Sequence, residues 1–100
     1  MEKYTKLVRD KIPEILDEKG IPYEKSITEG EELKNWLMLK LEEEFLEFKQ
    51  DKNVEELADV LEVIKALENL PEFKDLESVR NKKAEERGGF DKGIILTGEK

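Results

Sequence analysis

The stretch Lys40–Leu61, KLEEEFLEFKQDKNVEELADVL, decides the fold of this chain. It holds two short acidic motifs, EEFLE at 43–47 and ELAD at 56–59, separated by a polar segment at 49–53. A polar break of this length is typical of the turn between two antiparallel helices. The stretch therefore predicts a helical hairpin that carries one acidic motif in each arm.

The acids of the two motifs lie on the sides of the helices that are expected to face inward. Successive helical residues advance by about 100°, so residues three or four apart share a side. On this basis five acids lie on the same sides of the helices as the apolar residues Leu37 and Val63. An apolar side of a helix normally faces the core. The five acids are Glu43, Glu44, Glu47, Glu56 and Asp59.

The hairpin also predicts that four of these carboxylates meet. If the turn centres between residues 51 and 52, Glu47 is level with Glu56, and Glu44 is level with Asp59 one turn higher. Two carboxylates about 5 Å apart repel each other by roughly 3 kcal/mol at an effective dielectric constant near 20. Either the acids take up protons or a cation lies among them.

A site built from oxygen ligands alone suits Mg²⁺, Mn²⁺ or Ca²⁺. The chain contains no cysteine and no histidine, which excludes a zinc site built from thiolates or imidazoles and any nucleophile that depends on these residues. The competing interpretation is an ordinary solvated acidic face, because 44% of the residues are charged.

Composition limits the partners of the protein. One hundred residues without internal repeats indicate one domain, 1–100, and the net charge of −8 disfavours a nucleic-acid polymer or an anionic membrane as partner. The absence of cysteine, of a long apolar run and of a signal peptide favours a cytoplasmic location. The helix after the turn is apolar on two sides, so a homodimer or homotetramer is expected.

The whole chain is predicted to be all-α, a bundle of about four helices around the central hairpin. We expect a short helix from an Asp10 cap to about Lys19, a long helix from a Thr28 capping box to about Gln50, and a third from an Asn53 cap to about Asn69. A fourth helix should follow Pro71, begin at residue 72 or 75, and end at about residue 87. The pattern leaves open whether residues 21–27 and 90–96 form a minor pair of short strands.

Other residues are candidates for contacts with a substrate. Arg9, Lys11, Lys83 and Arg87 are the residue types that hold phosphates, although pairing with nearby surface acids is the simpler interpretation. Trp36 lies two turns before Glu43 on the same side and could stack on a base, although tryptophan in an apolar stripe usually belongs to the core.

These motifs resemble the all-α nucleoside triphosphate pyrophosphohydrolase superfamily, which includes the MazG-like and phosphoribosyl-ATP pyrophosphohydrolase-like proteins. EEFLE at 43–47 is similar to its Glu-Glu-x-x-Glu motif, and ELAD at 56–59 to its Glu-x-x-Asp motif. KLVRDKIPE at 6–14 and EERGGF at 85–90 resemble the opening and the close of one small branch. The gap between the acidic motifs is shorter than in many members.

The resemblance implies Mg²⁺-dependent hydrolysis, sometimes with Mn²⁺, of a nucleoside triphosphate or related nucleotide to the monophosphate and pyrophosphate. It implies metal ligands at Glu44, Glu47, Glu56 and Asp59, with Glu43 as a further ligand or as the general base. Substrates could include non-canonical nucleotides. Two alternatives stay open: the phosphoribosyl-ATP pyrophosphohydrolase of histidine biosynthesis, and a non-catalytic acidic helical module that binds a partner protein.

Overall fold

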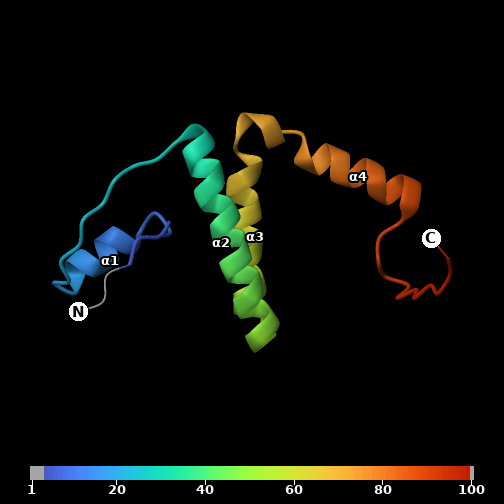
Figure 1. The fold of residues 1–100 in the computed structure, drawn as a ribbon, viewed down its shortest axis with the longest axis horizontal. Helices are drawn as coiled ribbons and strands as arrows, with labels where there is room; N and C mark the ends of the chain where they lie inside the picture. Colours follow the sequence, from blue (N-terminus) through green and yellow to red (C-terminus); the bar gives the residue numbers. More distant parts are fainter. Residues whose placement is uncertain (1–3, 100) are drawn as a thin grey trace.

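The computed structural model describes residues 4–99 and is all-helical over that range. Its elements are α1 (Ile12–Glu18), α2 (Gly30–Asp51), α3 (Val54–Glu68), the short 3₁₀ helix η1 (Pro71–Phe73) and α4 (Leu76–Arg87). The α2 and α3 helices form an antiparallel hairpin at the centre, and α1 and α4 extend on opposite sides of it (Figure 1). The predicted all-α class is therefore confirmed.

The turn of the hairpin consists of two residues with clear roles. Lys52 adopts a left-handed conformation with φ of 52°, and its N–H donates to the Phe48 carbonyl at 2.8 Å. The Asn53 Oδ1 atom accepts a hydrogen bond from the Glu56 N–H at 2.9 Å, which satisfies one of the free donors at the start of α3. The predicted Asn53 cap is confirmed, and this cap fixes the start of the helix that carries the second acidic motif.

The core is small and lies between the two helices of the hairpin. Leu37 of α2, Val63 of α3 and Leu70 after α3 are its buried apolar residues. Partly buried neighbours complete it, namely Leu7, Leu33, Leu41, Ala66 and Leu67. Because Leu7 comes from the N-terminal segment, that segment is held against the hairpin on the side where the acidic motifs lie.

Two predicted helix caps are wrong. Lys11, rather than Asp10, occupies the cap position of α1, and Glu29, rather than Thr28, occupies that of α2. Neither helix start has a side-chain capping bond, and the Thr28 hydroxyl is buried without a hydrogen-bond partner. Gly30, the first residue of α2, has a left-handed φ of 61°, a conformation that glycine adopts without strain.

The two strands left open by the sequence do not form within residues 4–99. Residues 21–27 connect α1 to α2, whereas residues 90–96 follow α4 on the other side of the hairpin (Figure 1). Strands need a partner to satisfy their backbone groups, and neither segment lies beside the other. The expected pairing of 21–27 with 90–96 is therefore wrong.

The molecule is open rather than closely packed. Its radius of gyration is 17.8 Å, whereas a compact chain of this length has about 13 Å. Within the described range, no helix combines the length and the apolar character needed to cross a membrane. The open shape leaves much of α1, α4 and the outer faces of the hairpin in contact with solvent.

Thr28 and Asn53, two of the predicted helix caps, provide a matched pair of substitutions. Asn53→Ala should lower the free energy of unfolding by about 1 kcal/mol, because the Glu56 N–H loses its acceptor. Thr28→Ala should change it by less than about 0.5 kcal/mol, because the hydroxyl bonds to nothing. Urea unfolding followed by circular dichroism measures both, and equal losses would contradict the assigned helix starts.

Candidate metal centre

Three carboxylates from both arms of the hairpin converge on one face. Glu44 comes from α2, and Glu56 and Asp59 come from α3, one turn apart. One carboxylate oxygen from each of these residues lies within 4.8 Å of the other two. The short turn produces this convergence because it brings the EEFLE motif of α2 beside the ELAD motif of α3.

The cluster leaves two buried oxygen atoms without partners. Glu44 is only 7% exposed, an unusual state for a carboxylate. The Oε2 atoms of Glu44 and Glu56 are both buried and accept no hydrogen bond. Buried polar atoms almost always have a partner, and one explanation for an orphan is an ion at the site. An all-oxygen donor set of this kind fits Mg²⁺ or Mn²⁺.

Glu47 belongs to the same group by its electrostatics, although its oxygen atoms are outside the set of three. The pKa of Glu47 is raised above its usual value, first by hydrogen bonding with Glu44, then by burial and by the charges of Glu44, Glu56 and Glu43. The pKa of Glu56 is also raised, first by burial and then by the neighbouring charges of Asp59, Asp51 and Glu44. The raised pKa values of both residues mean that the cluster is destabilised when all of its carboxylates are ionised.

Two cations border the cluster, and the prediction missed one of them. The Lys40 Nζ atom lies 3.2 Å from Glu44 Oε1 and 3.5 Å from Glu43 Oε1. A lysine three and four residues before two acids on one helix is the signal that could have identified it. The Arg9 Nη2 atom donates to Asp59 Oδ1 at 2.6 Å, so the N-terminal segment contributes a guanidinium to the cluster.

A hollow of about 270 Å³ lies beside the cluster, between the N-terminal segment and α2. Its lining includes Leu7, Trp36, Lys40 and Glu43. Trp36 is half-buried there, with part of its surface open to the hollow. An apolar wall, an indole and a lysine beside a carboxylate cluster could hold a flat ring next to a charged group.

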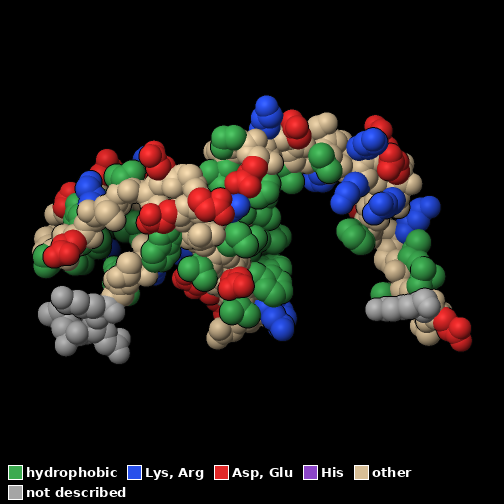
Figure 2. All heavy atoms as spheres, turned by 45° about the horizontal axis from the view of Figure 1, so that its top comes forward, with side chains coloured by type: hydrophobic (Ala, Val, Ile, Leu, Met, Phe, Trp, Pro, Cys, Tyr) green, Lys and Arg blue, Asp and Glu red, His purple; other side chains and the backbone are tan. Residues whose placement is uncertain are grey.

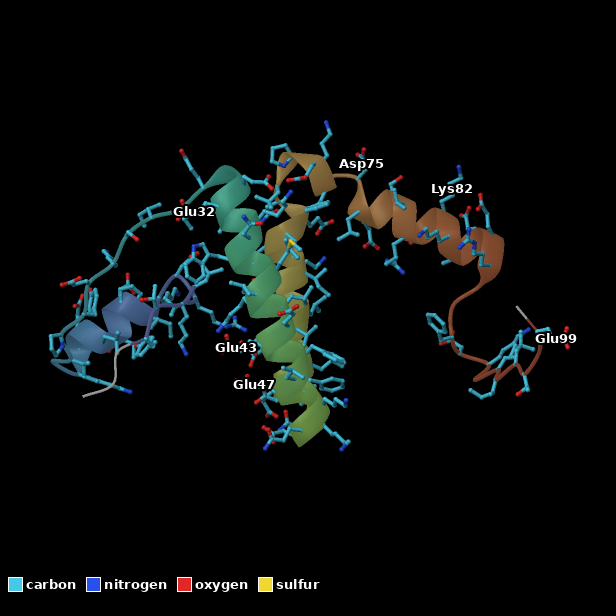
Figure 3. The ribbon with its side chains drawn as sticks, in the orientation of Figure 1. Glu32, Glu43, Glu47, Asp75, Lys82 and Glu99 are labelled. Atoms are coloured by element: carbon cyan, nitrogen blue, oxygen red, sulfur yellow. The ribbon has the colours of Figure 1, made fainter. Side chains whose placement is uncertain are left out.

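The structure does not bring the remaining predicted contacts to the cluster. Lys11 is exposed at the cap position of α1. Lys83 and Arg87 lie on α4. Lys82 of the same helix is on the opposite side of the hairpin from Glu43 and Glu47 (Figure 3). Of the four basic residues predicted to contact phosphates, Arg9 is the one that the structure places at the carboxylates.

The raised pKa values predict how stability depends on pH. Between the ordinary value of 4.5 and the raised pKa values of Glu47 and Glu56, the folded protein binds more protons than the unfolded chain. Its free energy of unfolding should therefore fall as pH rises through this window in the presence of a chelator. Glu47→Gln and Glu56→Gln should each flatten the fall, whereas the exposed Glu55→Gln should not.

Urea unfolding at several pH values between about 4 and 8 measures this dependence. If the pH slope of both cluster variants matched that of the unaltered protein, the two carboxylates would not interact with their neighbours as described.

No protein-family model matches this chain, and no match was found among curated proteins or solved structures.

Proposed function

We propose that this protein is a nucleotide pyrophosphohydrolase of the all-α superfamily that its motifs resemble. In this proposal it hydrolyses a nucleoside triphosphate, including non-canonical ones, to the monophosphate and pyrophosphate with Mg²⁺, and it acts in the cytoplasm, where such nucleotides occur. The observation that carries the proposal is the convergence of Glu44, Glu56 and Asp59, two of which have a buried oxygen without a partner.

The proposed metal ligands are the carboxylates of Glu44, Glu56 and Asp59, joined by Glu47 once it is ionised. A bound Mg²⁺ or Mn²⁺ would neutralise phosphate charge, lower the pKa of a bound water and orient the attack. The chain itself provides rigidity, because all four acids lie on two helices that share a core. A preformed set of ligands is what in-line phosphoryl chemistry requires.

The remaining residues fit the parts of a nucleotide. The Arg9 side chain is 55% exposed and already contacts an acid of the cluster, so its free N–H groups can reach a phosphate placed there. Lys40 is suited to contacts with the phosphates, and Trp36 is suited to stacking on the base in the adjoining hollow. Lys11, Lys83 and Arg87 remain candidates for phosphate contacts at lower rank, because nothing places them at the cluster.

The proposed reaction is an in-line displacement at the α-phosphorus. A bond forms between the oxygen of water and the α-phosphorus, and the bond from that phosphorus to the oxygen bridging to the β-phosphate breaks, so pyrophosphate leaves with the bonding electrons. Glu43 accepts the proton of the attacking water. Glu43 is suited to this role because it borders both the hollow and the cluster, where Lys40 contacts it.

Removal of proposed ligands should strongly lower turnover without unfolding the protein. Glu47→Gln and Asp59→Asn should each lower the rate of pyrophosphate release by about 100-fold or more, the typical effect of removing one group that stabilises transition-state charge. Glu55→Gln and Glu62→Gln are matched controls, because both residues are exposed on α3 and neither is among the three converging carboxylates. They should leave the rate unchanged.

The assay uses a panel of canonical and damaged nucleoside triphosphates with Mg²⁺. Full activity of the two ligand variants would contradict the assigned ligands. Turnover of phosphoribosyl-ATP alone would favour the enzyme of histidine biosynthesis. Absence of pyrophosphate release from every nucleotide would leave the non-catalytic helical module as the better description.

Metal binding can be tested without turnover. Mg²⁺ or Mn²⁺ should raise the melting temperature, with a stabilisation of about 2.7 kcal/mol at a hundredfold excess over the dissociation constant. Glu56→Gln should remove most of this increase, and Glu55→Gln should retain it. Calorimetry that detects no uptake of either ion, with or without nucleotide, would contradict the proposed metal centre.

A further inference from the structure

Lys40 is held against the carboxylate cluster by two acids of its own helix. Its Nζ atom lies 3.2 Å from Glu44 Oε1 and 3.5 Å from Glu43 Oε1. Its side chain is only 17% exposed, whereas lysine side chains are mostly in contact with solvent. Because the two acids follow Lys40 by three and four residues on α2, all three side chains share one side of the helix. Lys40 is therefore a resident positive charge of the cluster.

The contact with Lys40 distinguishes the two oxygen atoms of Glu44. The Oε1 atom faces the ammonium group, whereas the Oε2 atom is buried and has no hydrogen-bond partner. The same carboxylate converges with those of Glu56 and Asp59, and the Oε2 atom of Glu56 is also buried without a partner. One oxygen of Glu44 is therefore committed to a cation of the protein, and the other is free for an ion.

The oxygen atoms that could bind a second ion are the ones that Lys40 contacts. In two-metal sites the ions lie about 3.5–4 Å apart, so a second ion needs carboxylates next to those that hold the first. Glu43 is the sequence neighbour of Glu44, and Lys40 contacts the Oε1 atom of each. A divalent ion on these two oxygens would lie beside the ammonium group and be repelled by its charge.

The other cations of residues 4–99 are placed differently. Arg9 pairs with Asp59, but its side chain is 55% exposed on a segment without secondary structure, so it can leave the acid at little cost. Figure 2 shows further Lys and Arg side chains gathered over α4, at the right of the molecule and apart from the hairpin. Lys40 is thus the cation that is fixed at the cluster before any ion binds.

We propose that Lys40 takes the place of a second metal ion, so that each chain binds one divalent ion and keeps the ammonium group as its second cation. The inference rests on the proposed metal-dependent function and adds the number of ions that the site takes. Lys40 is a positioning residue in this scheme, because it acts through Glu43 and Glu44. It keeps Glu43 out of the metal coordination, so the Glu43 carboxylate stays free to accept a proton from water.

Counting bound ions in the full-length chain tests the proposal. Titration with Mn²⁺, followed by calorimetry and by electron paramagnetic resonance, should give one ion per chain for the unaltered protein. Lys40→Gln should bind two, because the oxygens of Glu43 and Glu44 lose the ammonium group, and two ions about 4 Å apart should give an exchange-coupled spectrum. Lys40→Arg keeps the positive charge and should retain one ion.

Lys65→Gln is the control for net charge, because Lys65 is exposed on α3 and pairs with Glu68 rather than with the cluster. It should bind one ion. Circular dichroism checks that each variant is folded, and Lys40→Met provides a second neutral replacement whose apolar chain suits the half-buried position. Two ions in the unaltered protein or in Lys40→Arg would overturn the proposal, as would a single ion in a folded Lys40→Gln or Lys40→Met.

The ion count also separates this inference from the proposed function. Two ions per chain together with pyrophosphate release would overturn the role of Lys40 and leave the enzyme activity intact. One ion per chain, rising to two in Lys40→Gln, without pyrophosphate release from any nucleotide would support the role of Lys40 and contradict the enzyme activity. Absence of Mn²⁺ uptake would overturn both.

Discussion

The constraint on which the structure depends is that packing of the apolar stripes of α2 and α3 forces carboxylates together. Leu37 and Val63 are buried against each other's helix, and the same stripes continue into Glu44 and Glu56. The helices cannot bury the leucine and the valine without also bringing the acids close. The raised pKa values of Glu47 and Glu56 are the electrostatic consequence of this packing.

Two cationic side chains reduce the electrostatic repulsion among these carboxylates, and they do so in different ways. Lys40 is fixed by its own helix, and its side chain is only 17% exposed, so its charge is a permanent part of the cluster. Arg9 is on an extended segment and its side chain is 55% exposed, so it can leave Asp59 at little cost. A cluster stabilised by one fixed cation and one exchangeable cation is well suited to accept an incoming ion or phosphate.

Features that depend on a local sequence pattern could be predicted from the sequence. Features that depend on how distant segments of the chain are placed could not. The hairpin, the approach of acids from its two arms and the Asn53 cap depend on residues within about ten positions of the turn, and all were predictable. The caps at Asp10 and Thr28 were wrong because each helix begins one residue later than the cap pattern predicts. The paired strands were wrong because distant segments must meet, and no local signal shows whether they do. The contact between Arg9 and Asp59 joins residues fifty positions apart and is equally invisible to local pattern.

The same few residues encode both faces of the hairpin. In Glu44-Phe45 and in Glu56-Leu57, an acid is followed at once by an apolar residue. On a helix this adjacency sends the two side chains in directions about 100° apart, so the acids turn toward the cluster while Phe45 and Leu57 stay about half exposed. A slip of one residue in the turn would disturb both faces together. The two-residue turn at Lys52 and Asn53 is therefore under two constraints, the convergence of the carboxylates and the directions of Phe45 and Leu57.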